Sequence, residues 1–448
     1  MKKVLLVTYA WPPAGGPGVQ RVLKFAKFLP QFGWQPVVLT VKGGTFAAID
    51  ESLNKEVAAS CHVYQGSTLE PTALYKRFVG MKSADRIPIA VLAEPNPSLK
   101  KKLANWVRLN FFVPDAKVGW WPGAVAEGSR AIREEQPDLI FSSAPPPTTH
   151  LVAKTLAKRF DIPWVADFRD PWTDTHYYEG HRRAHLVERL DRSLERSVCT
   201  AADRLVFVSR LDAEAYGERH AISDKCAHIP NGYDELDFSE LPTVEPKRDK
   251  FTLVHLGGLG VERNPVNLFR AVRALVDEGV IKPEQICLQL IGNVQESVVA
   301  SAKEAGAGTF LELVPYVPHH EALTYAARAH ALLLLITQSQ HNLRILPGKT
   351  FEYIRYGKPI VALGPPGGEV DRILREVGAG SVMGYEDSAA IKATVSALYQ
   401  RWQAGDALHS AGAAAIQPYT REKLARQLGS VFDELVHAPK RGTLVGAD

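Results

Sequence analysis

The chain has 448 residues, of which 46% are hydrophobic and 23% are charged, and its formal net charge is +4. This length exceeds what one hydrophobic core usually supports, so we predict two domains with the composition of an ordinary globular protein. No segment approaches the roughly 20 apolar residues of a membrane-spanning helix, which argues against an integral membrane protein.

The cysteines and the first residues indicate a cytoplasmic protein. Cys61, Cys199, Cys226 and Cys287 are widely spaced without a CxxC pair, which argues against a zinc ribbon or a disulfide framework. The first residues, MKKVLLVTYAWPP, have a basic start and an apolar run that covers only residues 4–10. A buried first strand explains this run better than a signal peptide does.

The first half of the chain repeats a strand–loop–helix pattern. We predict helices at residues 19–32 and 149–160, and strands at residues 3–8, 36–41, 139–142, 164–168 and 204–209. Parallel strands joined by helices form a doubly wound sheet, whose ligands bind beyond the carboxyl ends of the strands. Candidate functional residues are therefore sought in the loops that follow strands.

The pattern pauses at a polar, proline-bearing linker, residues 231–250, and then restarts. A helix is predicted at residues 265–278, and strands at 251–256, 287–291, 332–336 and 360–363. Two doubly wound halves imply a cleft. We predict an N-terminal domain (1–240), a C-terminal domain (251–415), a C-terminal helix (416–436) and a tail (437–448).

The stretch from Arg344 to Glu369 places charged residues beside a glycine loop. A short helix from Lys349 is followed by a buried strand, the glycine loop 364–368 and a second helix. Helix N-termini next to glycine loops attract anions, and Lys349 adds a positive charge there. Glu352 shares the helix face and could accept hydrogen bonds from a ribose. The pattern indicates a nucleotide-sugar site, with a surface ion pair between Lys349 and Glu352 as the alternative.

Two loops have the pattern G-x-G-x-x-R, each between a strand and a helix: Gly16, Gly18 and Arg21, and Gly258, Gly260 and Arg263. Such loops suit phosphate contact. Neither completes GxGxxG, and Lys42 stands where an NAD enzyme places an acidic ribose ligand, which argues against a dinucleotide cofactor. Arg263 is the better phosphate-binding cation.

The loop that follows the strand at 164–168 carries three charges, on Asp167, Arg169 and Asp170. Charged residues beside a core are seldom unpaired. They either pair with one another structurally or face the cleft and orient a hydroxyl.

His181 and His185 are spaced four residues apart, as in some helical metal sites. No glutamate lies between them and no third ligand lies nearby, so a solvated helix face is favoured over zinc. The chain also has no D-x-D pair for a divalent metal. We predict no metal and no cofactor.

Positive charge is concentrated in residues 71–113, where eight Lys and Arg residues face two acidic residues, a net charge of +6. Leu99, Leu103, Trp106, Val107 and Phe111 interleave with Lys100, Lys101, Lys102 and Arg108. This pattern predicts an interfacial helix on an anionic membrane surface. A solvated basic face over a core helix is the alternative.

Together these motifs resemble a GT-B retaining glycosyltransferase of family 4, of the bacterial polysaccharide or O-antigen type. The resemblance rests on WPPAGGPGVQR, DFRDPW, IPNGYD, HLGGLGVERNP and GKTFEYIRYGKPIVALGPPGGE, in this order. It implies two Rossmann-like domains facing a cleft, with a nucleotide-diphosphate sugar bound by the C-terminal domain and the acceptor by the N-terminal domain. It also implies that the final helix returns to the N-terminal domain and that no metal is required.

Transferred by position, the family's diphosphate-binding cation corresponds to Arg263 and its ribose-binding glutamate to Glu352. Three positions depart from the family pattern. Arg169 stands where many members have a histidine, Gly258 where many have an arginine, and Arg344 in place of the first glutamate of E-x7-E. The resemblance leaves Lys349 or Arg344 to supply the missing positive charge.

We therefore predict a retaining glycosyltransferase that extends a lipid-linked glycan in surface polysaccharide biosynthesis, peripheral at the inner face of the plasma membrane and without nucleic-acid partners. The alternatives are a GT-B nucleotide-sugar epimerase and a non-catalytic sugar-nucleotide-binding protein. The predicted catalytic residues are Asp167, Arg169, Asp170, Arg263 and Lys349. The donor-binding residues are Gly16, Gly257, Gly258, Arg263, Lys349 and Glu352. The acceptor-side residues are Gly15, Gly18, Arg21, Ser143 and His150.

Overall fold

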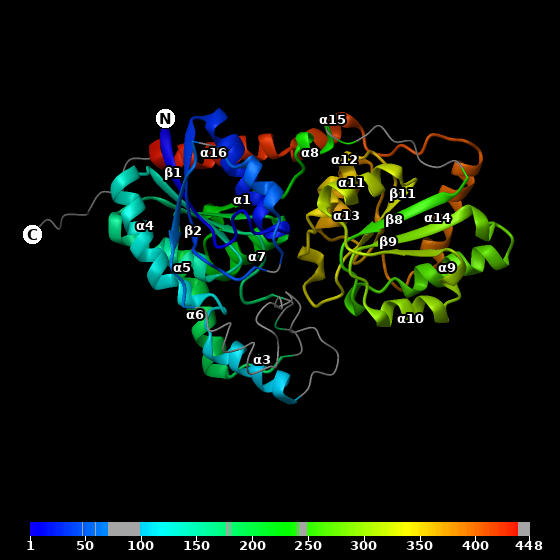
Figure 1. Ribbon diagram of the computed structural model, residues 1–448, viewed down its shortest axis with the longest axis horizontal. Helices are drawn as coiled ribbons and strands as arrows, with labels where there is room; N and C mark the ends of the chain where they lie inside the picture. The colour runs from blue at the N-terminus through cyan, green and yellow to red at the C-terminus, as the bar shows by residue number, and fades with distance from the viewer. Residues whose placement is uncertain are drawn as a thin grey trace, which may run out of the picture. The chain divides into compact units, whose positions relative to one another are not determined.

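The chain forms two compact α/β units (Figure 1). The computed structural model describes residues 1–46, 48–58, 60–69, 99–175, 178, 181–239, 241 and 249–437. One unit comprises Met1–Pro230 with Arg421–Asp448, and the other comprises Asn231–Thr420. The division falls ten residues before the predicted boundary at 240, because Tyr233 is buried in the core of the second unit and its amide donates to the carbonyl of Tyr419.

The first unit is built on a seven-stranded parallel sheet in the order β3-β2-β1-β4-β5-β6-β7. The order reverses between β1 and β4, as in doubly wound sheets. The strands are β1 (Lys2–Val7), β2 (Trp34–Val41), β3 (His62–Gly66), β4 (Leu139–Ala144), β5 (Trp164–Phe168), β6 (Arg204–Phe207) and β7 (Cys226–His228).

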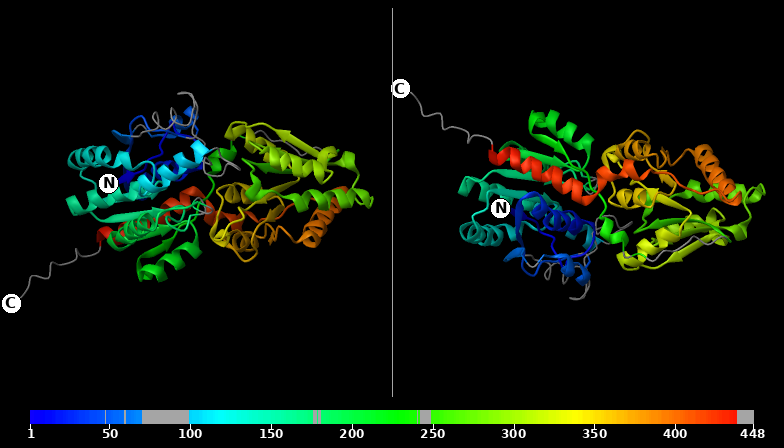
Figure 2. Two further views of the ribbon diagram at one scale, coloured as in Figure 1. Left: turned by 90° about the horizontal axis from the view of Figure 1, so that it is seen from below. Right: turned by 90° about the horizontal axis from the view of Figure 1, so that it is seen from above.

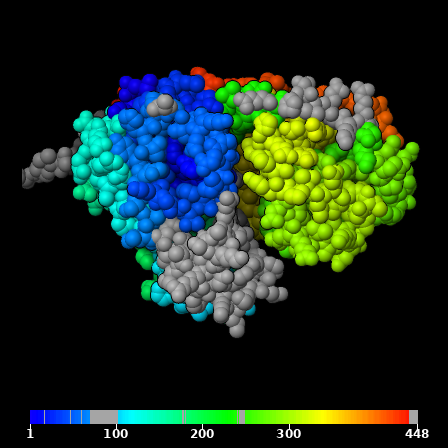
Figure 3. Space-filling model, in the orientation of Figure 1, coloured from blue at the N-terminus to red at the C-terminus, as the bar shows by residue number. Residues whose placement is uncertain are grey.

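Helices cover both faces of this sheet. The helices of this unit are α1 (Pro17–Phe28), α3 (Leu99–Phe111), α4 (Trp121–Glu135), α5 (Thr148–Phe160), α6 (His185–Ala201), α7 (Arg210–His220) and α16 (Arg421–His437), of which α3 lies beside the start of α6 and not on the sheet (Figure 1). The short 3-10 segments are Leu29–Phe32, Glu51–Glu56, Val118–Trp120 and Ser223–Lys225. The predicted return of the last helix to the N-terminal domain is confirmed, because α16 packs along α1 (Figure 2). Its red atoms emerge beside the dark blue N-terminal residues in the space-filling view (Figure 3).

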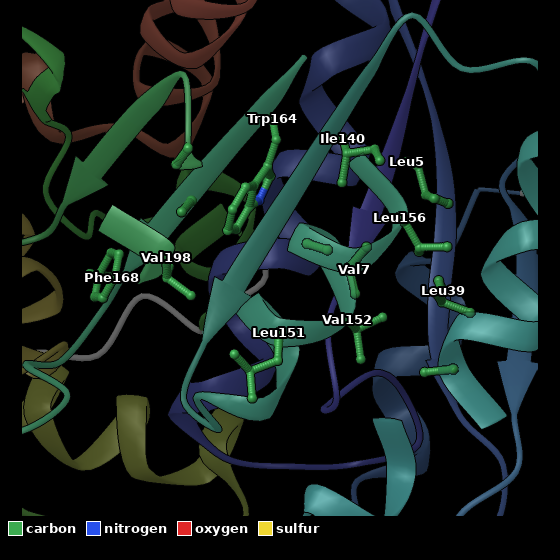
Figure 4. Close-up of a cluster of buried hydrophobic side chains, with 14 of the residues drawn as sticks. Leu5, Val7, Leu39, Ile140, Leu151, Val152, Leu156, Trp164, Phe168 and Val198 are labelled. Carbon is green, nitrogen blue, oxygen red and sulfur yellow. The ribbon is translucent and has the colours of Figure 1, made fainter. Parts of the chain in front are cut away.

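Alternate residues of the central strands enter two separate cores. Leu5 and Val7 of β1 point into the core that Leu151 and Leu156 of α5 complete (Figure 4). Val4 and Leu6 join the core on the opposite face, which α1 and α16 cover. Parallel strands buried on both faces are continuous apolar runs, which is why the sequence located β1, β4 and β5.

The second unit has a six-stranded parallel sheet in the order β10-β9-β8-β11-β12-β13. Its strands are β8 (Phe251–Leu256), β9 (Ile286–Ile291), β10 (Leu311–Val314), β11 (Ala331–Leu335), β12 (Ile360–Leu363) and β13 (Val382–Met383). Its helices are α8 (Glu235–Ser239), α9 (Val266–Asp277), α10 (Glu296–Glu304), α11 (His319–Arg328), α12 (Lys349–Arg355), α13 (Glu369–Val377), α14 (Ser388–Gln403) and α15 (Ala413–Ile416). The short 3-10 segments are Val261–Arg263, Pro283–Gln285, Ala307–Thr309, Asn342–Arg344 and Gln417–Tyr419.

The strands that the sequence did not locate are short or lie at sheet edges. These are β3, β7, β10 and β13, and β13 has only two residues. Such strands lack the continuous apolar run of a buried central strand, so periodicity does not detect them. Among the described residues, no helix is long and apolar enough to cross a membrane. Residues 71–98 of the predicted basic segment, the side chains of Leu99, Lys100 and Lys101, and the tail from 438 onward lie outside what the structure describes.

Candidate functional site

The glycine loop after β8 has the backbone geometry that requires glycine. Gly257 has φ +106°, and a Cβ atom there would lie 3.0 Å from Nζ of Lys349. Gly292, at the end of β9, packs its own backbone against Gly257. Gly258 differs, because an added Cβ would meet nothing closer than the Asn293 carbonyl at 3.7 Å. Of the two glycines in this loop that were predicted to bind the donor, Gly257 alone has a positive φ and a close neighbour that disfavour a side chain.

Helix α12 is attached to the end of β8 by two of its side chains. Nζ of Lys349 donates to the carbonyl of Leu256, and the amide of Leu256 donates to the hydroxyl of Tyr353 at 2.9 Å. Lys349 and Tyr353 are four residues apart and so share one helix face. This clamp holds the Lys349 ammonium against the glycine loop.

The ammonium of Lys349 lies in a cationic environment. Burial, and next the nearby charge of Arg263, lower the pKa of Lys349 to about 7, against the opposing effect of Glu352. The Lys349 side chain is half-buried and donates to the Leu256 carbonyl, so a surface ion pair with Glu352 does not describe its main contact.

Arg263 is the second cation of this group. Its Nη2 lies 3.4 Å from Oε1 of Glu262, and its side chain is 27% exposed. Within the described residues, its Nε is buried and has no hydrogen-bond partner. An unsatisfied donor beside a second cation is unfavourable until an acceptor, above all an anion, arrives.

Two backbone amides at the start of α12, which the sequence predicted to bind an anion, already donate to carbonyl groups of the chain. The amide of Thr350 donates to the carbonyl of Pro347 at 3.0 Å, and that of Phe351 to Gly348 at 3.2 Å. These two amides are therefore already satisfied, and the Lys349 side chain adds a positive charge at this helix start.

Two more residues of the predicted donor stretch lie near these cations in sequence. The Glu352 carboxylate, 29% exposed, lies 3.7 Å from Nε2 of His319 on α11. Arg344 ends a 3-10 turn that packs against the start of α13, where a Cβ on Gly368 would lie 2.8 Å from the Leu343 carbonyl.

His255, one residue before the end of β8, was missed by sequence reasoning. It is fully buried, and its Nδ1 lies 2.9 Å from the carbonyl of Leu333, so Nδ1 carries the proton. Burial, and next Lys349 and Arg263, lower its pKa well below the ordinary value, and Nε2 has no partner among the described residues. The signal that could have identified it is a histidine inside the apolar run FTLVHL.

In the first unit, Arg21 and Asp167 form a buried ion pair. Nη2 of Arg21 lies 2.7 Å from Oδ1 of Asp167, with side-chain exposures of 1% and 0%. Nε contacts both carboxylate oxygens, Nη1 donates to the carbonyl of Pro230, and Nη2 donates also to the carbonyl of Ile229. Ser143 donates to Oδ2 at 2.7 Å. The structural-pairing alternative therefore holds for Asp167, and neither it, Arg21 nor Ser143 directs these polar groups outward as a site residue would.

Arg169 joins two loops at the carboxyl edge of this sheet. Its guanidinium donates to the carbonyls of Gly18, Ala144 and Pro145. A Cβ on Gly18 would lie 3.6 Å from Nη1 of Arg169. Arg169 thus holds the start of α1 beside the loop after β4, whereas Asp170, the next residue, is exposed.

Gly15 and Gly16 shape the turn into α1. Gly16 is the N-cap residue with φ +92°, and a Cβ on Gly15 would lie 3.2 Å from Cβ of Asp50. Gly16 lies in the first unit, whereas the other predicted donor-binding residues lie in the second.

His150 is part of the core. It is fully buried, Nδ1 lies 2.8 Å from Oγ of Ser142, and its ring lies tilted against that of Phe168, with 4.6 Å between the ring centroids. Burial lowers its pKa to about 3, so the ring is neutral near pH 7. Its predicted place on the acceptor side is corrected, because the apolar positions of α5 carry it under the sheet.

The predicted solvated helix face around His181 and His185 holds only for His185, because α6 begins at His185, His181 before it is half-buried, and Arg183 is buried against Asp191. The side chain of His185 is 98% exposed, and its Nδ1 lies 3.7 Å from Glu188.

The chain is similar to proteins of known family and structure. Residues 15–232 match the family described as the glycosyl transferase 4-like domain. Sucrose-phosphate synthase of Thermosynechococcus elongatus is similar in structure, with a TM-score of 0.63 and 15% identity over 98% of this chain and 100% of that one. Anabaena HepE, determined with UDP and glucose, has a TM-score of 0.63 and 13% identity over 97% and 100% of the two chains.

A Listeria monocytogenes protein described as a UDP-N-acetylglucosamine 2-epimerase has a TM-score of 0.56 and 13% identity over 98% of each chain. No curated protein sequence matches the chain at a significant level. The fold is thus shared by transferases and by a protein described as an epimerase, so fold alone does not identify the reaction.

The two doubly wound units define a protein of the GT-B fold. Residues 15–232, nearly all of its N-terminal unit, match the glycosyl transferase 4-like family model, in agreement with the resemblance in sequence. Family and fold together support a role in glycosyl transfer.

Proposed function

We propose that the chain is a retaining, metal-independent glycosyltransferase that moves a sugar from a nucleotide-diphosphate sugar to a lipid-linked glycan in surface polysaccharide biosynthesis. The second unit would bind the donor and the first the acceptor. Because a lipid-linked acceptor lies in a membrane, the protein would act as a peripheral protein at the inner face of the plasma membrane. The HepE structures with UDP and with UDP-glucose support a nucleotide sugar as the donor class.

The observation that carries this proposal is the pair of cations at the end of β8. Lys349 and Arg263 are close enough for Arg263 to lower the pKa of Lys349, and Nε of Arg263 is buried without a partner in the described part of the chain. A diphosphate would satisfy the donor and neutralise both charges.

The same cations would act in the chemical step. Negative charge develops on the leaving diphosphate as the bond to the sugar breaks, and fixed cations stabilise that charge without reorganisation. Lys349 is held by the Leu256 carbonyl, so its ammonium is positioned before the donor binds. Glu352, half-buried on the same helix, would accept hydrogen bonds from the ribose.

The test begins with thermal shifts against a panel of UDP- and GDP-sugars, since a ligand that binds only the folded state raises its melting temperature. With the donor found, we expect Arg263→Ala and Glu352→Ala to abolish transfer while the circular dichroism spectrum is unchanged. Arg270→Ala, which removes an exposed arginine of the following helix α9, is the matched control. Full activity of both site variants would refute the assignment.

The epimerase alternative is favoured only by the shared fold with the Listeria protein. It is tested by following nucleoside diphosphate release with and without acceptor. A transferase releases it in proportion to acceptor glycosylated, whereas an epimerase converts the donor without acceptor. Dialysis against EDTA tests metal independence, and loss of activity restored by a divalent cation would contradict it.

A further inference from the structure

Helix α3 has its apolar side outward. Leu103, Trp106, Val107 and Phe111 are 52%, 46%, 37% and 70% exposed. The side that faces the protein is made by Ala104, Asn105 and Leu109, which are 4%, 5% and 8% exposed, so the outward apolar residues are additional to those that α3 buries. Residues 103, 106 and 107 recur at helical spacing, so they form one stripe. A helix that only covered a core would bury this stripe.

The start of α6 continues the same surface. Leu186 and Leu190, four residues apart, are 79% and 49% exposed. The amide of Ala184 donates to Oδ1 of Asn110 at 2.7 Å, and Nε of Arg183 donates to the carbonyl of Leu109 at 3.5 Å. The end of α3 and the start of α6 are therefore joined, as the ribbon view also shows (Figure 1).

Exposed basic side chains lie on the same two segments as these leucines and aromatic rings. They are Lys102 on α3, Arg182 just before α6, and Arg189 and Arg192 on α6. Arg183, which points inward, is neutralised by Asp191 at 2.8 Å. Within the described residues, none of the four exposed cations forms an ion pair, so their charge is available to a partner.

We propose that α3 and the start of α6 together form a docking surface for an anionic lipid membrane. We define this surface by Leu103, Trp106, Val107, Phe111, Leu186 and Leu190 with their flanking cations. Leucine and aromatic side chains enter the boundary between headgroups and acyl chains, while arginine and lysine bind anionic headgroups. Tryptophan is favoured at that depth.

Charge argues against the other occupants. A second copy docked by the same surface would bring its arginines against these arginines, and like charges in an interface oppose association. The centre of a protein interface is also depleted in charged residues, whereas here cations and apolar residues alternate. This proposal rests on the proposed function in one respect only, which is that the lipid-linked acceptor would lie in the membrane that this surface binds.

The experiment is flotation of the full-length protein with vesicles of phosphatidylcholine alone and of phosphatidylcholine with phosphatidylglycerol. We expect binding to the anionic vesicles only. Changing Arg189→Ala and Arg192→Ala together should lower the partition coefficient roughly thirtyfold, from two lost headgroup contacts. Leu186→Ser with Leu190→Ser should lower it by a similar factor.

The controls are Leu313→Ser with Tyr316→Ser, which removes exposed apolar residues of the second unit, and Lys158→Ala on α5. Both should bind as the wild type does. Wild-type binding by the α6 variants, or no binding by the wild type, would overturn the proposal. A dimer in light scattering that dissociates in the α6 variants would assign the surface to self-association instead.

Failure of this proposal is separable from failure of the proposed function. Transfer to a short soluble acceptor should survive in the α6 variants, whereas transfer to a lipid-linked acceptor in vesicles should fall. Vesicle binding without transfer on any acceptor would leave the docking surface standing and refute the transferase.

Discussion

The buried pair of Arg21 and Asp167 gives the sharpest prediction for stability. The Arg21 side chain is only 1% exposed, and Asp167→Ala would leave its guanidinium without a counter-charge. Breaking one partner of a buried pair costs about 3–5 kcal/mol. At an m value of about 2 kcal/mol per M of urea, the unfolding midpoint should fall by roughly 1.5–2.5 M.

Tryptophan fluorescence is the assay, because only Trp402 of the eight tryptophans lies in the second unit. The signal therefore follows the unit that contains the pair. Arg130→Ala is the control, since Arg130 pairs with Glu127 at the surface with its side chain 56% exposed. Exposed pairs contribute little, so its midpoint should hardly move.

A double variant, Arg21→Met with Asp167→Leu, separates the charge from the packing. Removing both charges leaves no buried unpaired ion, so the double variant should recover most of the loss. A midpoint for Asp167→Ala equal to that of Arg130→Ala would refute the structural role given to the pair. A double variant as unstable as the single would show that packing, and not charge, dominates.

Three further predictions concern the candidate site and the pH dependence of folding. Gly257→Ala should weaken binding of UDP or GDP more than tenfold by calorimetry, because its positive φ and the nearby Lys349 ammonium exclude a Cβ, whereas Gly258→Ala should bind normally. Nucleotide binding at pH 8 should take up a proton, because a bound anion raises the pKa of Lys349 from about 7. Calorimetry in buffers of different ionisation enthalpy measures this proton uptake, and Lys349→Met should abolish the uptake. Hydrogen bonds from Lys3 and next His62 lower the pKa of Glu135 to about 2, so Glu135→Gln should destabilise the first unit at pH 7, and the difference should shrink as the pH falls from about 4.5 towards 2.

Each of these has a result that contradicts it. Equal nucleotide affinity in the two glycine variants would remove the steric argument. Identical apparent enthalpies in every buffer would mean that Lys349 is already fully charged. A stability difference for Glu135→Gln that stays constant down to pH 2 would show that its charge does not contribute.

The sequence by itself determined the elements whose signal is local. Buried parallel strands are continuous apolar runs, so both the first and the last residues of β5, β8 and β12 were predicted correctly. Glycines and charges next to those ends marked Gly257 and Lys349, because ligand loops in doubly wound sheets follow the strands. The two-unit fold followed from the repeated pattern.

The tertiary structure decided which polar groups meet. Arg21 and Asp167 are 146 residues apart, and the side-by-side placement of β1, β4 and β5 brings the loops after them to one edge of the sheet. Once there, a carboxylate and a guanidinium without water must pair, which turned two predicted site residues into structural ones. His150 was buried for a related reason, since its helix face packs on the sheet.

The same holds for surfaces. The sequence marked the apolar and basic pattern of α3, but nothing local linked it to Leu186 and Leu190, about eighty residues later. Hydrogen bonds between the end of α3 and the start of α6 join them. Local patterns specify elements because they depend on neighbours along the chain, whereas sites and surfaces depend on neighbours in space, which only the packed sheet brings together.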